Sequence, residues 1–123
     1  ITNELEVETY LQSQGFVSVC YEDLNVFDQI ALTKNAKIIV SLHGAGLTNT
    51  MFMQEGSTVL ELTPIPSTKK DFRFPFWRIC DLLKIRYFVQ FCNTIDKGET
   101  DMYTRDVSVD MSEFKAIIEN IVK

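Results

Sequence analysis

The stretch "KIIVSLHGAGLTNTMFMQEGSTVLEL", residues 37–62, decides the fold of this chain. An apolar run over residues 37–42 leads into a His-Gly-Ala-Gly turn, and a second apolar run follows at 57–62. The first run has no polar alternation before Ser41, which is typical of a strand covered on both faces. We therefore expect two parallel strands, joined through the turn and a short helix.

Helical and strand patterns continue to alternate on both sides of this unit. Further helices are expected at 3–14, 26–36, 75–83 and after Asp110, and further strands at 16–21, 85–91 and, shorter, at 106–109. Strands that alternate with helices over short loops form a mostly parallel sheet with helices on both faces. The chain is thus predicted to be a single α/β domain over residues 1–123, of the Rossmann-like three-layer kind.

Three expected helices begin at residues suited to capping a helix N-terminus. Asn3 stands three residues before Glu6, Asp110 stands three residues before Glu113, and Asn25 precedes the helix at 26–36. In that last helix the spacing predicts an inner face made of Phe27, Ile30 and Ala31.

Charge and composition exclude several classes of function. The net charge is −5 with only 12 Lys and Arg residues, whereas nucleic-acid binders usually neutralise phosphates with a basic face. No apolar run approaches the roughly 20 residues of a membrane-spanning helix. The acidic, polar first residues are unlike a signal peptide. An acidic domain can still hold one phosphorylated small molecule with backbone donors.

The three cysteines, Cys20, Cys80 and Cys92, are far apart and each lies in or beside an apolar run. A disulfide framework or a zinc site would need closer, paired spacing. We expect buried free thiols, and no metal site.

The His-Gly-Ala-Gly turn allows two interpretations. Gly44 and Gly46 would let a ligand approach the backbone, and the unpartnered amides of the following helix favour an anion. Alternatively, the glycines only permit a tight turn. His43 can donate to a phosphate, act as a general base, or simply bond nearby backbone. Glu61 can accept from a ribose or cap a helix amide, and Asn49 can contact a ligand or cap the helix.

Other motifs are missing or incomplete. The sequence has no G-x-S-x-G elbow, no P-loop and no Asp-x-Asp pair. A dinucleotide fold is closer, because Gly44, Gly46 and Glu61 imitate its fingerprint. However, Asn49 takes the third glycine position, and the glycines follow the second expected strand rather than the first. Lys69, Lys70 and Arg73 form a basic cluster that either neutralises a phosphate or is simply solvated.

The assembled pattern resembles the C-terminal part of glycosyltransferase family 61. It consists of "ITNE" at the start, "GF" before a strand, Asp28-Gln29, and "A-x-I-I-V-x-x-HGAGLTN-x-x-F-M-x-x-G-x-x-V-L-E-L" over residues 36–62. The family includes xylan arabinosyl- and xylosyltransferases, O-linked GlcNAc transferases of the secretory pathway, and bacterial capsular polysaccharide proteins. The resemblance runs from Ile1 to about Phe91.

This resemblance implies a GT-B enzyme, in which two Rossmann-like domains face each other and the C-terminal one holds the nucleotide-sugar. Transfer would invert the sugar without a metal and without a cofactor, a UDP-sugar being the expected donor substrate. The backbone at Gly44, Ala45 and Gly46, continuing to Leu47 and Asn49, would hold the donor diphosphate. His43 would lie beside it as the candidate catalytic residue, and Glu61 would lie at the ribose.

The resemblance also implies a longer, two-domain enzyme. The glycan or protein acceptor, and the catalytic base, would come from the side of the N-terminal domain, so we expect these 123 residues to be inactive alone. The apolar surface facing that domain could let them self-associate into a homo-oligomer. The enzyme would act in the cytoplasm if bacterial and in the secretory lumen if eukaryotic. Two alternatives stay open: an NAD-type oxidoreductase fragment, and a non-catalytic α/β interaction domain.

Overall fold

A four-stranded, mostly parallel sheet forms the centre of the molecule. The computed structural model describes residues 1–66, 74–95 and 105–123. The sheet has the order β1 (Ile38–Leu42), β2 (Thr58–Pro64), β3 (Arg86–Ile95) and β4 (Asp106–Ser108). The first three strands are parallel to one another and β4 is antiparallel to β3. The predicted α/β class with a mostly parallel sheet is therefore confirmed.

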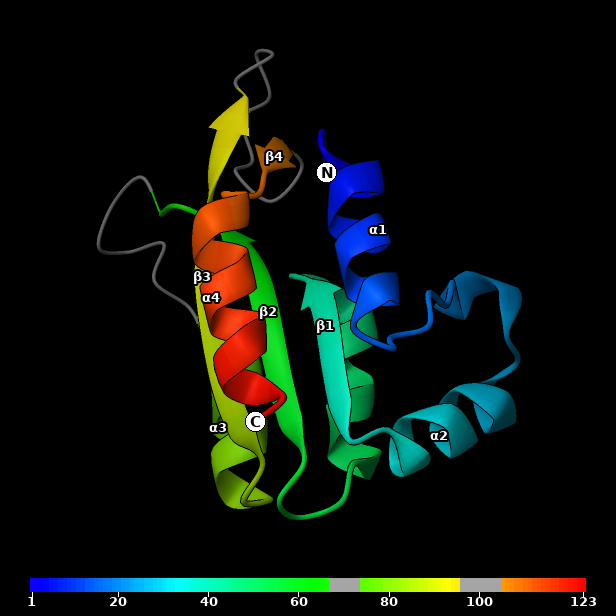
Figure 1. Ribbon diagram of the computed structural model, residues 1–123. Coiled ribbons are helices and arrows are strands. Elements are labelled where there is room, and N and C mark those ends of the chain that lie inside the picture. The colour runs from blue at the N-terminus through cyan, green and yellow to red at the C-terminus, as the bar shows by residue number, and fades with distance from the viewer. Residues whose placement is uncertain (67–73, 96–104) are drawn as a thin grey trace.

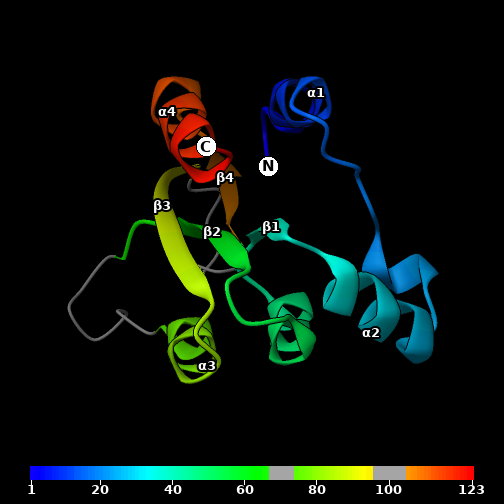
Figure 2. The same ribbon diagram turned by 60° about the horizontal axis from the view of Figure 1, so that its bottom comes forward.

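Helices lie on both faces of this sheet (Figures 1 and 2). One face carries α1 (Glu4–Ser13) and α4 (Met111–Ile121), and the other carries the 3-10 helix η2 (Ala45–Phe52) and α3 (Pro75–Leu82). A short 3-10 turn, η1 (Tyr21–Asp23), precedes α2 (Val26–Asn35), which lies beyond the β1 edge of the sheet. Pro75 opens α3 as expected, since its missing N–H costs nothing in the first turn.

Strand β2 is the centre of the core because all seven of its residues are buried. Leu60 and Leu62 pack on the α1 and α4 face, together with Phe114 and Ile118. Val59 packs on the opposite face, where Leu47, Met53, Phe76, Cys80 and Ile85 form a second cluster. Side chains alternate along a strand, so Glu61 points to the same face as Val59.

Two of the three predicted helix caps are present. The Asp110 carboxylate accepts from the amides of Ser112 and Glu113, and the Asn25 side chain accepts from the amide of Asp28. The predicted Asn3 cap is wrong. The Asn3 amide group instead accepts from the Val109 N–H at 3.0 Å and donates to the Val109 carbonyl at 2.9 Å. It therefore ties the start of α1 to the connection between β4 and α4.

The strand expected at 16–21 is also wrong. Residues 16–20 have no regular structure, and Val17 and Val19 are 84% and 44% exposed. This segment bonds α2 instead of β1: Tyr21 shares a 2.6 Å hydrogen bond with the Thr33 hydroxyl, and the Gln29 amide donates to the Tyr21 carbonyl. Strand β1 consequently forms the edge of the sheet.

The inner face expected for the helix at 26–36 is only partly right. Phe27 is 83% exposed, and the buried residue of α2 is Thr33, whose hydroxyl bonds both Tyr21 and the Gln29 carbonyl. The reason is the place of α2, which lies beside the sheet rather than over one of its faces (Figure 2).

Of two further predicted features, one cannot be placed and the other is confirmed. The basic residues Lys69, Lys70 and Arg73 lie outside the described residues. The short strand expected at 106–109 is confirmed as β4. None of the helices in the described part of the chain combines the length and the apolar character that crossing a membrane requires.

The environments of the three thiols differ. Cys80 and Cys92 are completely buried, and burial raises the pKa of each to about 11. Cys20 is exposed, contrary to the expectation of three buried thiols, because the segment around it does not join the sheet.

This difference predicts a simple labelling result. At about pH 8, a thiol reagent should modify Cys20 quickly and the other two thiols roughly 100-fold more slowly, because the thiolate is the reactive form and is scarce when the pKa is raised. Cys20→Ser should remove the fast phase. If two or three thiols per chain reacted in the fast phase, the core around Cys80 and Cys92 would be open to the reagent.

Candidate ligand site at the carboxyl ends of the parallel strands

Two of the residues singled out by the sequence, His43 and Glu61, meet where β1 and β2 end. Ser41 pairs with Glu61 and Leu42 with Leu62, so both parallel strands end at the same edge of the sheet. The His43 amide then donates to the Leu62 carbonyl at 2.7 Å, which fixes the first residue of the turn against β2. In open parallel sheets, this is the edge at which ligands bind.

Glu61 is a buried carboxylate with two partners. Only 1% of the residue is exposed, and it faces the side of the sheet covered by η2 and α3. One carboxylate oxygen, Oε1, bonds His43 Nδ1, and the other, Oε2, accepts a 2.6 Å hydrogen bond from the Tyr87 hydroxyl. Burial, followed by the bond to Glu61, raises the pKa of Tyr87, so this hydroxyl stays protonated and donates.

His43 is held on two sides. Its side chain is 17% exposed, and its ring lies 5.4 Å from the ring of Phe76, tilted by 60°. Since a carboxylate only accepts hydrogen bonds, the proton in the bond to Glu61 belongs to Nδ1. In the neutral ring the second nitrogen, Nε2, then carries the lone pair.

Gly44 and Gly46 have no conformational need to be glycine. Gly44 is extended, with φ of 170°, and among the described residues the glycines in the left-handed region are Gly15 and Gly56, with φ of +87° and +84°. A Cβ on Gly44 would come no closer than 3.9 Å to the Leu42 carbonyl, and one on Gly46 no closer than 3.8 Å to the Tyr21 ring. Neither the turn nor its packing therefore demands these glycines, which favours a role for the space above them.

The remaining predicted residues lie along η2. Leu47 is buried, and its amide donates to the Gly44 carbonyl at 3.1 Å, so it serves the fold. The Asn49 side chain donates to the Gln29 side chain at 3.2 Å and thereby ties η2 to α2. Ala45, Gly46, Leu47 and Asn49 all line a wide groove of about 1990 Å³ between η2, β1 and the segment before α2.

The structure thus divides the predicted residues into two groups. His43 and Glu61 meet on the side of β2 that faces α3, whereas the residues from Ala45 to Asn49 line the groove on the α2 side. The sequence analysis missed Tyr87 as part of the site. The pattern predicted the strand that carries it, but the register that brings Tyr87 to Glu61 exists only in the sheet.

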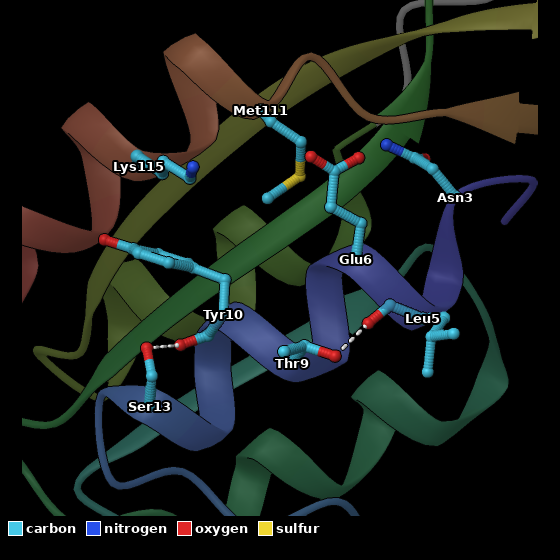
Figure 3. Close-up of a pocket in the computed structure, with 8 residues that line it drawn as sticks. All are labelled: Asn3, Leu5, Glu6, Thr9, Tyr10, Ser13, Met111 and Lys115. Atoms are coloured by element: carbon cyan, nitrogen blue, oxygen red, sulfur yellow. Dashed lines mark hydrogen bonds between the residues drawn. The ribbon is translucent and has the colours of Figure 1, made fainter.

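Another hollow, of about 640 Å³, lies between α1 and the start of α4 (Figure 3). The hydroxyls of Thr9 and Ser13 at its wall donate to carbonyls of their own helix, at 2.7 and 2.6 Å. The Lys115 ammonium lies 5.4 Å from the centre of the Tyr10 ring. The hydroxyls of Thr9 and Ser13 are thus used within α1, and none of the predicted site residues lines this hollow. Across residues 1–66, 74–95 and 105–123, no three His, Cys, Asp or Glu side chains gather as a metal ion would need.

Comparison with known proteins supports the family resemblance that the sequence indicated. The model for glycosyltransferase 61 matches residues 1–60, from α1 into β2. The resemblance to this family is therefore confirmed, on the half of the chain that carries the His-Gly-Ala-Gly turn.

Individual relatives agree with the family model. Human protein O-linked-mannose beta-1,4-N-acetylglucosaminyltransferase 2 is 46% identical over 68 residues, which are 52% of this chain and 12% of that protein. Dog EGF domain-specific O-linked N-acetylglucosamine transferase is 36% identical over 62 residues, or 50% and 12%. Rice alpha-1,3-arabinosyltransferase XAT3 is 27% identical over 105 residues, or 82% and 18%. The chain thus spans less than a fifth of the length of these relatives.

Proposed function

From this kinship with glycosyltransferase family 61, we propose that the chain is the donor-binding part of a glycosyltransferase. The domain would correspond to the C-terminal, Rossmann-like half of a GT-B enzyme, which transfers sugar with inversion and without a metal ion. One observation carries the proposal: the family's His-Gly-Ala-Gly turn follows a parallel strand at the carboxyl edge of the sheet. Neither the backbone conformation nor the packing of the chain requires a glycine at position 44 or 46.

The donor diphosphate would be held by the backbone of Gly44, Ala45 and Gly46. Backbone amides at the start of a helix bind a phosphate without basic side chains. Such a site suits a chain with a net charge of −5. His43 lies beside this turn and would meet the donor directly, as the candidate catalytic residue. Leu47 and Asn49 would shape the site by fixing η2 against the core and against α2.

The relatives' names suggest the kind of substrate. Each names a transferase of a sugar residue, N-acetylglucosamine or arabinose. We propose a UDP-sugar as the donor and a glycan or a protein as the acceptor. Because the chain spans so little of its relatives, the acceptor site and the catalytic base would lie in other parts of a longer enzyme, and this chain would not transfer sugar alone.

A titration followed by amide-resolved NMR tests this proposal. UDP, GDP, CDP and NAD are added in parallel to the ¹⁵N-labelled chain, without metal. We expect saturable shifts at Gly44 to Leu47 with UDP, and weaker or no shifts with the others. NAD-selective shifts would instead support an oxidoreductase fragment. No shift with any nucleotide, in this chain and in the longer protein that contains it, would make the turn purely structural.

A further inference from the structure

We propose that Glu61 and Tyr87 are positioning residues for His43. The buried Glu61 carboxylate holds His43 Nδ1, which fixes the orientation and the tautomer of the ring, so that a bound donor meets His43 through Nε2. Tyr87 holds the other oxygen of the same carboxylate. The inference rests on the proposed function for the identity of the ligand, but the tautomer itself can be measured without one.

The burial of Glu61 is the first argument. A carboxylate that is almost completely removed from water needs hydrogen-bond donors at both oxygens. His43 supplies one of them and Tyr87 the other. A ribose could replace either donor only by breaking one of these bonds inside the core. A role through His43 therefore fits the structure better than direct contact with the ligand.

The placement of the three residues is the second argument. Glu61 lies on β2, which is paired on both sides, and Tyr87 lies on the neighbouring β3, where it pairs with Val59. Side chains two apart on a strand share a face, so Tyr87 reaches Glu61 diagonally. The carboxylate is thus fixed by the most buried strand of the sheet, whereas His43 begins the turn. A side chain set on a rigid strand orients a group on a loop.

Phe76 completes the arrangement. Its ring packs against His43 from the first turn of α3, so the imidazole is confined on one side by the ring and at Nδ1 by Glu61. Burial and the charge of Glu61 also raise the pKa of the neighbouring Cys80 to about 11, so this thiol is not a competing ionised group near neutral pH.

The single histidine of the chain makes the test direct. Long-range ¹H–¹⁵N spectra report which ring nitrogen carries the proton, and in this chain every imidazole signal comes from His43. In the neutral form of the ring, we expect one tautomer with the proton on Nδ1. A proton mainly on Nε2 in the unaltered chain would overturn the proposal without any variant.

Two variants separate positioning from mere structure. Glu61→Leu removes the acceptor and should abolish the preference for Nδ1–H, while Glu61→Gln should restore most of it because its amide oxygen still accepts. UDP should bind Glu61→Leu about tenfold more weakly or worse, because His43 is no longer held in one orientation and one tautomer. Tyr87→Phe should keep the tautomer and weaken UDP binding by a smaller factor.

Tyr21→Phe is the matched control. It also removes a tyrosine hydroxyl from a 2.6 Å hydrogen bond, but that bond joins Thr33 and not Glu61. We expect no change in the His43 tautomer. A Glu61→Leu chain that folds and keeps both the Nδ1–H tautomer and full UDP affinity would refute the positioning role. If no nucleotide binds either the unaltered chain or a longer protein that contains it, the donor-binding proposal fails while the tautomer still decides this one.

Discussion

Replacing Phe114 by alanine is expected to lower the free energy of unfolding by about 3–5 kcal/mol. Phe114 is completely buried where α4 crosses the sheet, in the cluster that contains Leu60 and Leu62. Its ring also contacts Tyr10 edge to face, with centroids 6.1 Å apart, and so joins α1 to α4. The alanine variant loses the transfer energy of the ring and leaves a cavity between two helices and the sheet. Such a loss would remove much of the roughly 5–15 kcal/mol that stabilises a small domain.

Urea unfolding followed by circular dichroism measures this effect. Phe27→Ala is the matched control, because the same side chain is removed from a position that is 83% exposed on α2. The control should change the free energy of unfolding by no more than about 0.5 kcal/mol. Comparable losses in both variants would show that α2 packs against the core through Phe27, as the sequence pattern suggested.

Replacing Gly46 by valine is expected to weaken UDP binding by about tenfold or more. Gly46 opens the groove beside the turn, and its backbone conformation suits any residue. A Cβ there has its nearest contact with the Tyr21 ring, at 3.8 Å, and the methyl groups of valine would take up space that a diphosphate would need. The free energy of unfolding should change by less than about 1 kcal/mol.

Gly56→Val provides the reciprocal control. Gly56 has φ of +84°, where a side chain is strained although nothing lies within 4 Å of its Cβ. This variant should lose about 1–2 kcal/mol of stability and keep its affinity for UDP. Calorimetric titration and urea unfolding of both variants give the four values needed. Unchanged UDP affinity in Gly46→Val would remove the glycine turn from the donor site.

The parts of the fold that the sequence predicted are those with a strong local signal. The run at 57–62 and the stripe of Phe114, Ile118 and Ile121 are apolar enough to be buried in any arrangement of this class. The segment at 16–21 is equally apolar, yet it forms no strand. Whether such a segment reaches a sheet edge depends on competing contacts, here the bonds of Tyr21 to α2. The local sequence pattern carries no information about these competing contacts, so it cannot predict whether the segment joins the sheet.

The candidate site shows the same division. The order of strands and helices along the chain was enough to predict that His43 and Glu61 lie at the same edge of the sheet. The partner of Glu61 could not be predicted, because Tyr87 reaches it only through the register between β2 and β3. Asn49 and Leu47, which were expected at the ligand, contact Gln29 and the core respectively, and the sequence alone did not predict these contacts. A side chain near a glycine turn can stabilise the turn instead of binding a ligand.

The edge position of β1 has a consequence for how the chain refolds. Ile38–Leu42 is apolar, contains no proline, and pairs with a described strand on one side only. Its outer row of N–H and C=O groups is a template for any extended segment that reaches it first. In dilute solution the nearest such segment is the chain's own 16–20. At high concentration it is a neighbouring molecule, and the yield of refolded monomer should then fall as two sheets join edge to edge.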